Sequence, residues 1–364
     1  MKKRICIVGG EDVHKRINLS KYLISDGFDV TILGTSNKAF PSNITYIPYN
    51  LNRRFSFVSD YRTIVFYKKF FKAHTFDVIQ TFDTKPAFLL PLALLGTKTP
   101  IVRTITGLGT IFMSSSFFSF VLRQVYVFLH FIVRHRVNMT TFQNTDDRDI
   151  YLNKKLIDQS NHTLILSSGI ELDEIKLQAK RHNTPFTFIC VARLVYEKGI
   201  VNLIEAARIC ADKGYNFKYQ IVGPLEENSQ RLNESILKKY DDIVDRLGPR
   251  NDVLELLSRA DAFILPTFRE GFSRVLLEAA AVGLPCITTN VPGVGEIVRH
   301  EKEGLIAEVR NSQALASAMI RLATEPELAD ACAKNALERV TLFSLKTVAN
   351  QYISIYNQLI KTNP

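Results

Sequence analysis

The chain has 364 residues, of which 46% are hydrophobic and 23% are charged. This length suits two domains of about 150–200 residues each, and the composition excludes a disordered or fibrous protein. The net charge of +10 is uneven, because residues 1–166 carry 22 Lys and Arg against 11 Asp and Glu, whereas residues 167–364 carry 24 against 25.

The basic first half also holds 24 of the 37 Phe and Tyr residues. Two stretches, 53–74 and 117–136, concentrate both kinds of side chain. Basic and aromatic residues together favour an anionic membrane surface as a partner. We expect no nucleic-acid partner, since no RNA-binding motif accompanies them. The alternative is that these aromatics pack the core and that the basic residues form an ordinary surface.

The longest uncharged stretch, residues 104–122, contains two glycines and several hydroxyl side chains, and Arg123 closes it. A membrane-spanning helix needs about 20 mainly apolar residues, so we expect peripheral attachment rather than a span. The five cysteines lie scattered in apolar runs without metal-ligand spacing. They are expected to be reduced thiols of a cytoplasmic protein.

Short apolar strands alternate with helices along the first half. RICIVGG (4–10) reads as a buried strand ending in Gly9 and Gly10, and an amphipathic helix follows. Further strands are expected at 29–34, 76–82 and 100–105. This alternation predicts an α/β domain with a doubly wound parallel sheet. The turn GGEDVH lacks the GxGxxG spacing of dinucleotide-binding dehydrogenases.

The second half repeats this pattern and predicts a second doubly wound domain. Strands are expected at 186–192, 217–223, 261–266 and 284–290, and helices at 201–214, 253–260 and 274–283. We therefore expect four parts: an N-terminal domain over 1–166, a linker over 167–185, a C-terminal domain over 186–340 and an amphipathic final helix over 341–364. Open α/β sheets bind ligands at the carboxyl ends of their strands.

The segment EGFSRVLLE (270–278) follows the strand at 261–266. Gly271, Phe272 and Ser273 are expected to be the first residues of a helix, whose free N–H groups attract an anion such as a phosphate. Glu270 and Glu278 stand eight apart, on nearly the same helix face, so both can contact one extended ligand through its hydroxyl groups. The alternative is an ordinary helix start with a first-turn acid and a surface glutamate.

The segment VARLVYEKG (191–199) also follows a predicted strand. It places Arg193 and Lys198 on the loop that enters the next helix. Two fixed cations at such a place can clamp a diphosphate and stabilise its charge as it leaves. The alternative is that both are solvated loop charges. Both segments lie at carboxyl ends of strands in one domain. Their common position strengthens the interpretation of both as parts of one ligand site.

The chain resembles the retaining glycosyltransferases of family 4, which have the GT-B fold, over nearly its whole length. The resemblance rests on RLVYEKG, on LGPRNDVLELLSRADAFILPTFREGFSRVLLEAAAVGLPCITTNVPGVGEIV and on EGLIAEV. SSGIELDEI (167–175) and TGLGTIF (106–112) are similar to the bacterial branch that builds O-antigen, capsule or other lipid-linked glycans. The resemblance to this family implies two Rossmann-like domains facing a cleft and a final helix that crosses back to the N-terminal domain.

The resemblance implies transfer of a sugar, with retention, from a UDP-sugar to an acceptor of the undecaprenyl-diphosphate type. The sugar would be GalNAc, GlcNAc or Gal. Arg193 and Lys198 would hold the donor diphosphate, Glu270 the sugar hydroxyls and Glu278 the ribose. The remaining donor contacts implied are Gly9, Gly10, Arg250 near the base, and the segment Gly271, Phe272, Ser273, Arg274 and Val275.

The acceptor is expected at His14, Lys15 and Arg16, which begin the first helix beside the glycine turn. Cations are disfavoured at a helix start, so a lipid diphosphate is a candidate partner; the alternative is three solvated residues. Thr106 and Gly107 are expected to contact the acceptor as well. The chain departs from the family at Thr106, where many members carry a histidine. This departure puts a protein base in doubt and agrees with a reaction in which the leaving phosphate deprotonates the acceptor.

No metal or other cofactor is implied, because no Asp-x-Asp stands at the donor loops. The expected location is the cytoplasmic face of the bacterial inner membrane, with peripheral attachment. Two alternatives share the architecture: a sugar-nucleotide epimerase and a non-catalytic nucleotide-sugar-binding subunit of a membrane assembly. Thr106 argues against the first, and Glu270, Arg193 and Lys198 argue against the second.

Overall fold

The computed structural model describes residues 2–52, 55–108, 117–175, 183–226 and 232–362. The chain divides into two compact units, unit 1 (Met1–Gly169 with Leu345–Pro364) and unit 2 (Ile170–Ser344). The first division falls inside the stretch predicted as a linker, and the described residues after Gly169 in that stretch belong to unit 2.

Unit 1 contains a parallel sheet of seven described strands in the order β3-β2-β1-β4-β5-β6-β7. These strands are β1 Lys3–Val8, β2 Phe28–Gly34, β3 Thr45–Pro48, β4 Val78–Thr81, β5 Ile101–Ile105, β6 Met139–Phe142 and β7 His162–Leu164. The central strand β1 is buried on both faces, because Ile5 and Ile7 belong to one hydrophobic cluster and Cys6 and Val8 to another. A strand covered on both sides reads as a continuous apolar run, which is why RICIVGG predicted it.

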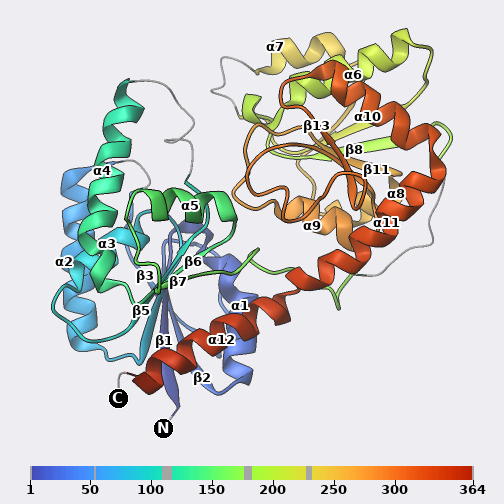
Figure 1. The fold of residues 1–364 in the computed structure, drawn as a ribbon. Helices are drawn as coiled ribbons and strands as arrows, with labels where there is room; N and C mark the ends of the chain where they lie inside the picture. The colour runs from blue at the N-terminus through green and yellow to red at the C-terminus, as the bar shows by residue number, and fades with distance from the viewer. Residues whose placement is uncertain (1, 53–54, 109–116, 176–182, 227–231, 363–364) are drawn as a thin grey trace. The chain divides into compact units, whose positions relative to one another are not determined.

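Helices cover both faces of the unit 1 sheet (Figure 1). They are α1 Ile17–Ser25, α2 Phe57–Ala73, α3 Pro86–Ala93, α4 Phe117–Val133, α5 Thr145–Asn153 and α12 Leu345–Thr362, with short 3-10 helices η1 Glu11–Arg16 and η3 Arg134–Arg136. Helices α1 and α12 pack with each other on one face, whereas α2, α3 and α4 pack in sequence on the other.

Helix α12 joins the core of unit 1 although it lies at the far end of the chain. Val348, Tyr352 and Tyr356 are almost fully buried in the cluster that contains Ile5 and Ile7. The Tyr356 hydroxyl donates to Oε1 of Gln80 on β4 at 2.9 Å, and the Tyr352 hydroxyl lies 2.9 Å from Oγ1 of Thr104 on β5. The last helix is therefore held by buried hydrogen bonds as well as by apolar contacts.

Unit 2 contains a parallel sheet of six described strands in the order β10-β9-β8-β11-β12-β13. These are β8 Thr187–Val191, β9 Lys218–Val222, β10 Asp245–Gly248, β11 Ala262–Leu265, β12 Cys286–Thr289 and β13 Gly304–Ala307. The two parallel sheets with helices on both faces confirm the predicted α/β fold class with two doubly wound domains.

The helices of unit 2 also form two layers (Figure 1). They are α6 Ile200–Asp212, α7 Glu234–Leu237, α8 Val253–Arg259, α9 Arg274–Ala281, α10 Ser312–Thr324 and α11 Pro326–Val340, with 3-10 turns η4 Tyr196–Lys198, η5 Lys238–Tyr240 and η6 Thr341–Phe343. Helix α6 packs on α10, and α9 packs on α8 and α11. Within the described part of the chain, no helix is long and apolar enough to cross a membrane.

The buried hydrogen bond of Tyr356 gives a test of how α12 is held. Tyr356→Phe leaves Oε1 of the fully buried Gln80 without its donor, which costs roughly 1–3 kcal/mol of stability. The matched control is Tyr61→Phe on α2, whose side chain is 68% exposed and should change stability by less than about 0.5 kcal/mol. The stability change in each variant is measured by hydrogen–deuterium exchange of α12 and β4 peptides at increasing urea concentrations. Equal protection in the two variants would contradict the role of this bond.

Candidate functional site

Two loops at the carboxyl edge of the unit 2 sheet are tied together by backbone contacts. The carbonyl of Glu197, on the loop after β8, accepts hydrogen bonds from the Phe268 N–H at 2.8 Å and from the Thr267 hydroxyl at 3.3 Å, both on the loop after β11. Gly199 has φ +71°, and a Cβ atom there would overlap the Pro266 carbonyl. Only a glycine permits this close approach, so the two loops act as one support.

This support brings together Lys198 and Glu270. The Lys198 ammonium donates to Oε1 of Glu270, and the two side chains are only 20% and 11% exposed. An ion pair so little exposed holds each side chain in one position, since leaving either partner unpaired would be costly. Lys198 has three N–H donors, so it can contact Glu270 and a phosphate oxygen at the same time.

The start of helix α9 differs from the prediction. Ser273 has extended backbone angles and caps the helix, its hydroxyl accepting from the Leu276 N–H at 3.4 Å, so α9 begins at Arg274. Gly271 and Phe272 therefore precede the helix, and Glu270 does not share a helix face with Glu278. That prediction was wrong because Ser273 is the N-cap, so the helical backbone begins only at Arg274, four residues after Glu270.

Glu278 lies one turn into α9 and has its own cation. Nε of Arg274 donates to Oε1 of Glu278 at 3.0 Å, an i,i+4 pair in which Glu278 is 21% and Arg274 55% exposed. Val275, next to them, is half-buried. Glu270 and Glu278 thus stand in the same unit but are held by different cations.

The other two predicted donor cations are each paired with a carboxylate, which lies on a neighbouring loop for Arg193 and on the same loop for Arg250. Arg193, after β8, donates to Glu226, and both side chains are at least half exposed. Arg250, after β10, donates through Nε and Nη2 to the two Asp252 oxygens at 2.8 and 2.5 Å. These hydrogen bonds raise the pKa of Arg250 and lower the pKa of Asp252, so both remain charged.

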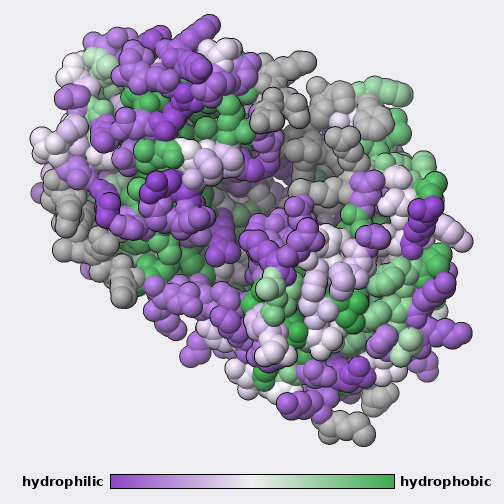
Figure 2. Space-filling view, turned by 180° about the vertical axis from the view of Figure 1, so that it is seen from behind, coloured by the Kyte–Doolittle hydropathy of each residue, from purple (hydrophilic) through white to green (hydrophobic). Residues whose placement is uncertain are grey.

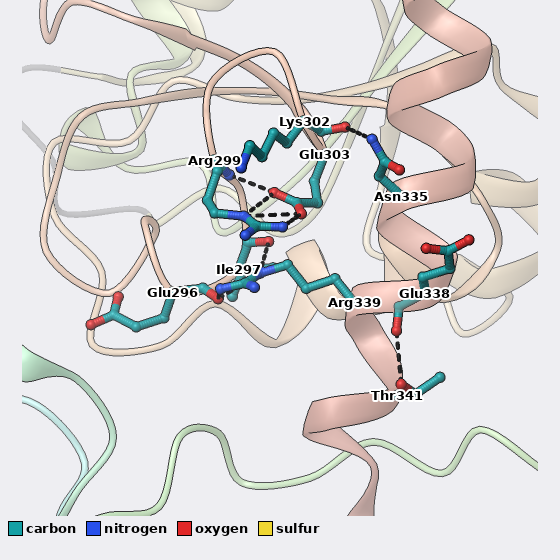
Figure 3. Close-up of polar contacts among 9 residues, drawn as sticks. All are labelled: Glu296, Ile297, Arg299, Lys302, Glu303, Asn335, Glu338, Arg339 and Thr341. Atoms are coloured by element: carbon teal, nitrogen blue, oxygen red, sulfur yellow. Dashed lines mark hydrogen bonds and ion pairs between the residues drawn. The ribbon is translucent and has the colours of Figure 1, made fainter.

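The loop after β12 packs against the backbone of the Glu270 loop. Gly293, with φ +78°, lies so close to the carbonyls of Glu270 and Gly271 that no Cβ atom would fit. Figure 3 shows how the following turn is held: Nε and Nη2 of Arg339, from α11, donate to the Glu296 carbonyl, and Nε also donates to the Ile297 carbonyl.

A second arginine, Arg299, is paired with Glu303 in the turn that follows (Figure 3). Glu303, 1% exposed, accepts from the Arg299 backbone N–H at 2.9 Å and from its guanidinium. Burial raises the pKa of Glu303, but the hydrogen bonds from Arg299 outweigh it and lower the pKa overall. Phe343 packs on Phe272, which belongs to the predicted donor loop, and the centres of the two rings lie 5.4 Å apart.

In unit 1, the predicted acceptor cations do not begin a helix. His14, Lys15 and Arg16 end the 3-10 helix η1, and α1 starts only at Ile17. That part of the prediction was wrong, because the chain makes a 3-10 segment between the glycine turn and α1.

These three residues also have partners within unit 1. Lys15 pairs with Asp12 at 3.0 Å, and His14 Nδ1 lies 3.0 Å from the Glu11 carbonyl. Arg16 is only 9% exposed, and its guanidinium lies 4.0 Å from the centre of the Phe82 ring. Arg16 is therefore largely a core residue.

The glycine turn of unit 1, formed by Gly9 and Gly10 after β1, contacts the carboxylate of Asp83. The Gly10 N–H donates to Oδ2 of Asp83 at 2.8 Å, and the Gly9 N–H donates to the Leu33 carbonyl at 3.0 Å. Asp83 follows β4 and has φ +69°, an uncommon conformation for a residue with a side chain. The turn thus contacts the protein's own acid, where the family resemblance implied an approach to the donor diphosphate.

A cavity of about 230 Å³ lies beside this turn, at the carboxyl edge of β1, β4 and β5. Thr106 lines it, whereas Gly107, which has φ +142°, is not among its lining residues. Lys85 also lines it and donates to Oδ1 of Asp60 at 2.6 Å, with both side chains about one-tenth exposed.

Sequence reasoning missed Asp83, Glu226 and Asp252, the acids that hold the predicted site residues or their loops. Asp83 and Glu226 each stand within four residues of the end of a predicted strand, which is a signal that could have found them. Nothing in the sequence pattern marks Arg339, because it lies on a helix far along the chain and acts through backbone carbonyls.

Two family matches cover most of the chain. Residues 173–339 match the family described as glycosyl transferases group 1, and residues 4–139 match the family described as glycosyl transferase 4-like. The first match covers most of unit 2 and the second most of unit 1.

Among curated relatives, a capsular polysaccharide biosynthesis glycosyltransferase, CapM of Staphylococcus aureus, is 33% identical over 54% of this chain and 54% of its own length. The match thus spans about half the length of that relative. An Escherichia coli enzyme named UDP-Gal:alpha-D-GlcNAc-diphosphoundecaprenol alpha-1,3-galactosyltransferase is 24% identical over 90% of this chain and 88% of its own length.

A sucrose-phosphate synthase of Thermosynechococcus elongatus has a similar fold, with a TM-score of 0.82 and 20% identity over 99% of this chain and all of its own. At this identity, the likeness bears on the fold alone. The fold, the two family matches and the relatives agree with the motifs at 191–199 and 270–278. The chain belongs to the family 4 glycosyltransferases, which have the GT-B fold.

Proposed function

We propose that this protein transfers a hexose or N-acetylhexosamine from a UDP-sugar to a lipid-linked diphosphate saccharide, with retention at the sugar and without a metal ion. The observation that carries this proposal is the ion pair of Lys198 and Glu270 at the carboxyl edge of the unit 2 sheet. A carboxylate that could accept hydrogen bonds from sugar hydroxyls lies directly beside a cation that could bind a phosphate, which supports the proposal. The name of the Escherichia coli relative supplies the substrate class.

Each paired residue has a role in this reaction. Lys198 would contact the donor phosphates while keeping Glu270 in place, and Arg193 would exchange Glu226 for a phosphate oxygen. Glu270 would accept hydrogen bonds from the sugar, Glu278 from the ribose, and Arg250 would lie near the base. The N–H groups at the start of α9, around Ser273, Arg274 and Val275, would favour the negative diphosphate.

The proposal also includes attachment to an anionic membrane at the cytoplasmic face, because the acceptor's lipid would remain in the bilayer. It is supported by helix α4, on which six apolar side chains recur at helical spacing and are at least 39% exposed: Phe117, Phe120, Val121, Phe128, Phe131 and Ile132. The opposite face of α4 is buried through Tyr126, His130 and Val133.

His130 fixes that buried face to the sheet. Its Nδ1 accepts from Nη1 of Arg103 on β5 at 2.9 Å, and burial and the adjacent guanidinium lower the pKa of His130, so it stays neutral. The exposed face of α4 is thus an apolar stripe on a firmly anchored helix. Figure 2 shows apolar side chains standing among hydrophilic ones at the molecular surface.

Helix α2 adds charge and further apolar groups to this part of unit 1. Phe57, Val58 and Tyr61 are 64–78% exposed at its start, and four exposed cations follow them: Arg62, Lys68, Lys69 and Lys72. By contrast, Tyr67 and Phe70 of the same helix pack in the core. Arg53 and Arg54, which belong to the stretch predicted to bind membrane, lie outside the described residues.

Glu270→Gln tests the sugar contact. The change keeps the size of the side chain but removes its charge, so turnover should fall about 10–100-fold, the loss expected for a hydrogen bond with a charged group of roughly 1.5–3 kcal/mol. UDP affinity should change much less, because the contact is to the sugar. Isothermal calorimetry with UDP and a product assay with a UDP-sugar measure the two. A parallel fall in both would assign Glu270 to the nucleotide instead.

The diphosphate contact is tested by Arg193→Ala and Lys198→Ala, with UDP binding and turnover measured in EDTA. Each variant should weaken UDP about tenfold or more, because it removes a charged hydrogen bond. Arg259→Ala is the matched control, since Arg259 is 62% exposed and paired with Glu255, much as Arg193 is 63% exposed and paired with Glu226. Activity that disappears in EDTA and returns with Mg²⁺ would show that these cations do not suffice.

Membrane attachment is tested by flotation with vesicles of phosphatidylglycerol and phosphatidylcholine. Lys68, Lys69 and Lys72 changed together to Glu should abolish binding, because each cation near an anionic surface contributes about 1 kcal/mol and the reversal adds repulsion. Changing the exposed Lys238, Lys239 and Lys334 of unit 2 to Glu alters the net charge equally and should leave binding intact. Binding of the wild type should fade with salt; no flotation at low salt would refute the attachment.

A further inference from the structure

The turn after β13 holds an arginine in an unfavourable backbone conformation. The Asn311 N–H donates to the Glu308 carbonyl at 3.3 Å, which closes a four-residue turn, and Arg310 is its third residue with φ +61°. A turn with a positive φ at its third residue is normally made with glycine, because a side chain there is crowded by its own backbone. The arginine therefore costs stability relative to glycine, unless its side chain makes a contact that offsets the cost.

The side chain of Arg310 makes such a contact across the carboxyl edge of the unit 2 sheet. Its guanidinium carbon lies 4.8 Å from the centre of the Phe268 ring, within the range of about 6 Å over which a guanidinium is attracted to an aromatic face. Phe268 is half-buried, and its ring meets the Tyr196 ring in a T-shaped pair with centres 5.4 Å apart. These three side chains connect the loop after β13 with the loops after β11 and β8.

The turn that carries Arg310 is itself fixed to helix α6. The side chain of Asn311 caps α10 directly after the turn. The Ser312 hydroxyl donates to Oε2 of Glu205 on α6 at 2.6 Å and accepts from Nδ2 of Asn202, on the same helix, at 3.0 Å. Because its base is held in this way, the guanidinium can restrain the ring that it contacts.

Phe268 transmits this restraint to the candidate site. Its N–H donates to the Glu197 carbonyl at 2.8 Å, next to Lys198, and Glu270 follows two residues later on the same loop. We propose that Arg310 is a positioning residue, whose guanidinium holds the Phe268 ring and thereby keeps the loop of Glu270 against the loop of Lys198. Its importance for transfer rests on the proposed function, in which Glu270 contacts the sugar.

The Phe268 amide reports this restraint directly, because it exchanges with deuterium only when its bond to Glu197 opens. We would label the protein with ¹⁵N-phenylalanine, which gives signals for 24 residues, and identify Phe268 by its absence in Phe268→Leu. Arg310→Gly should make this amide exchange about two- to fivefold faster, the effect expected for losing an exposed contact between a cation and a ring. Arg310→Lys keeps a cation and should retain most of the protection.

The matched control is Lys155→Gly in unit 1. Lys155 is likewise an exposed cation with a positive φ, +54°, so its replacement relieves the same kind of backbone strain away from the site. This variant should leave the Phe268 amide unchanged. Urea unfolding should show no loss of overall stability in Arg310→Gly, since the relief of its backbone offsets the lost ring contact.

Turnover is measured with UDP-GalNAc, UDP-GlcNAc and UDP-Gal in turn and extracted lipid-linked acceptor. Arg310→Gly should lower kcat at least about twofold, because a small displacement of Glu270 weakens its contact at the reacting centre. Its UDP affinity, measured by calorimetry, should stay unchanged, and Arg310→Lys should restore kcat.

Unchanged exchange of Phe268 in Arg310→Gly would overturn the proposal. Equally faster exchange of all phenylalanine amides in unit 2 would do so too, because it would show a general loss of stability instead of a local one. Unchanged kcat despite faster exchange at Phe268 would remove the positioning role. A wild type that transfers none of the three sugars would refute the proposed function alone, since the exchange measurement needs no substrate.

Discussion

The organisation of both units depends on one constraint, the parallel pairing of strands that are buried on both faces. Such strands must run in one direction, so all their carboxyl ends reach the same edge of the sheet. In unit 2 this brings the loops after β8 and β11 into contact through the Glu197 carbonyl. In unit 1 it brings the turn after β1 onto Asp83 after β4. Polar groups from distant parts of the sequence meet there without any special local pattern.

The cations at these edges are held by acids of the same unit. Lys198 pairs with Glu270, Arg193 with Glu226 and Arg250 with Asp252. The pairs differ in exposure to solvent, which decides how easily water or a ligand can replace each ion pair. The Lys198 pair is little exposed and keeps its geometry, whereas Arg193 and Glu226 are at least half exposed, so that water or a ligand can replace their contact at small cost.

Support for the site also comes from residues outside the predicted set of ligand contacts. Gly293 packs on the carbonyls of Glu270 and Gly271, and Arg339 holds the turn that follows Gly293. Phe343 connects Arg339 to Phe272 through ring contacts. The Glu270 loop is therefore fixed from the side of α11 as well as by Lys198, which is the kind of rigid setting that charged groups at a reacting centre require.

The sequence by itself determined the central strands of both sheets, the doubly wound fold class and the family, because buried apolar runs and the segments at 191–199 and 270–278 are local patterns. The short strands β3, β6, β7 and β10, at or near the sheet edges, were not predicted. It also indicated that Lys198 and Glu270 belong to one site. It did not determine where α9 begins, since Ser273 caps the helix instead of belonging to its first turn, nor that Arg16 is buried against Phe82. Only the tertiary structure decided which charges are paired and that Asp83 occupies the glycine turn. Such contacts join residues such as Gly10 and Asp83, 73 positions apart, and their energies depend on burial and distance, which no local pattern records.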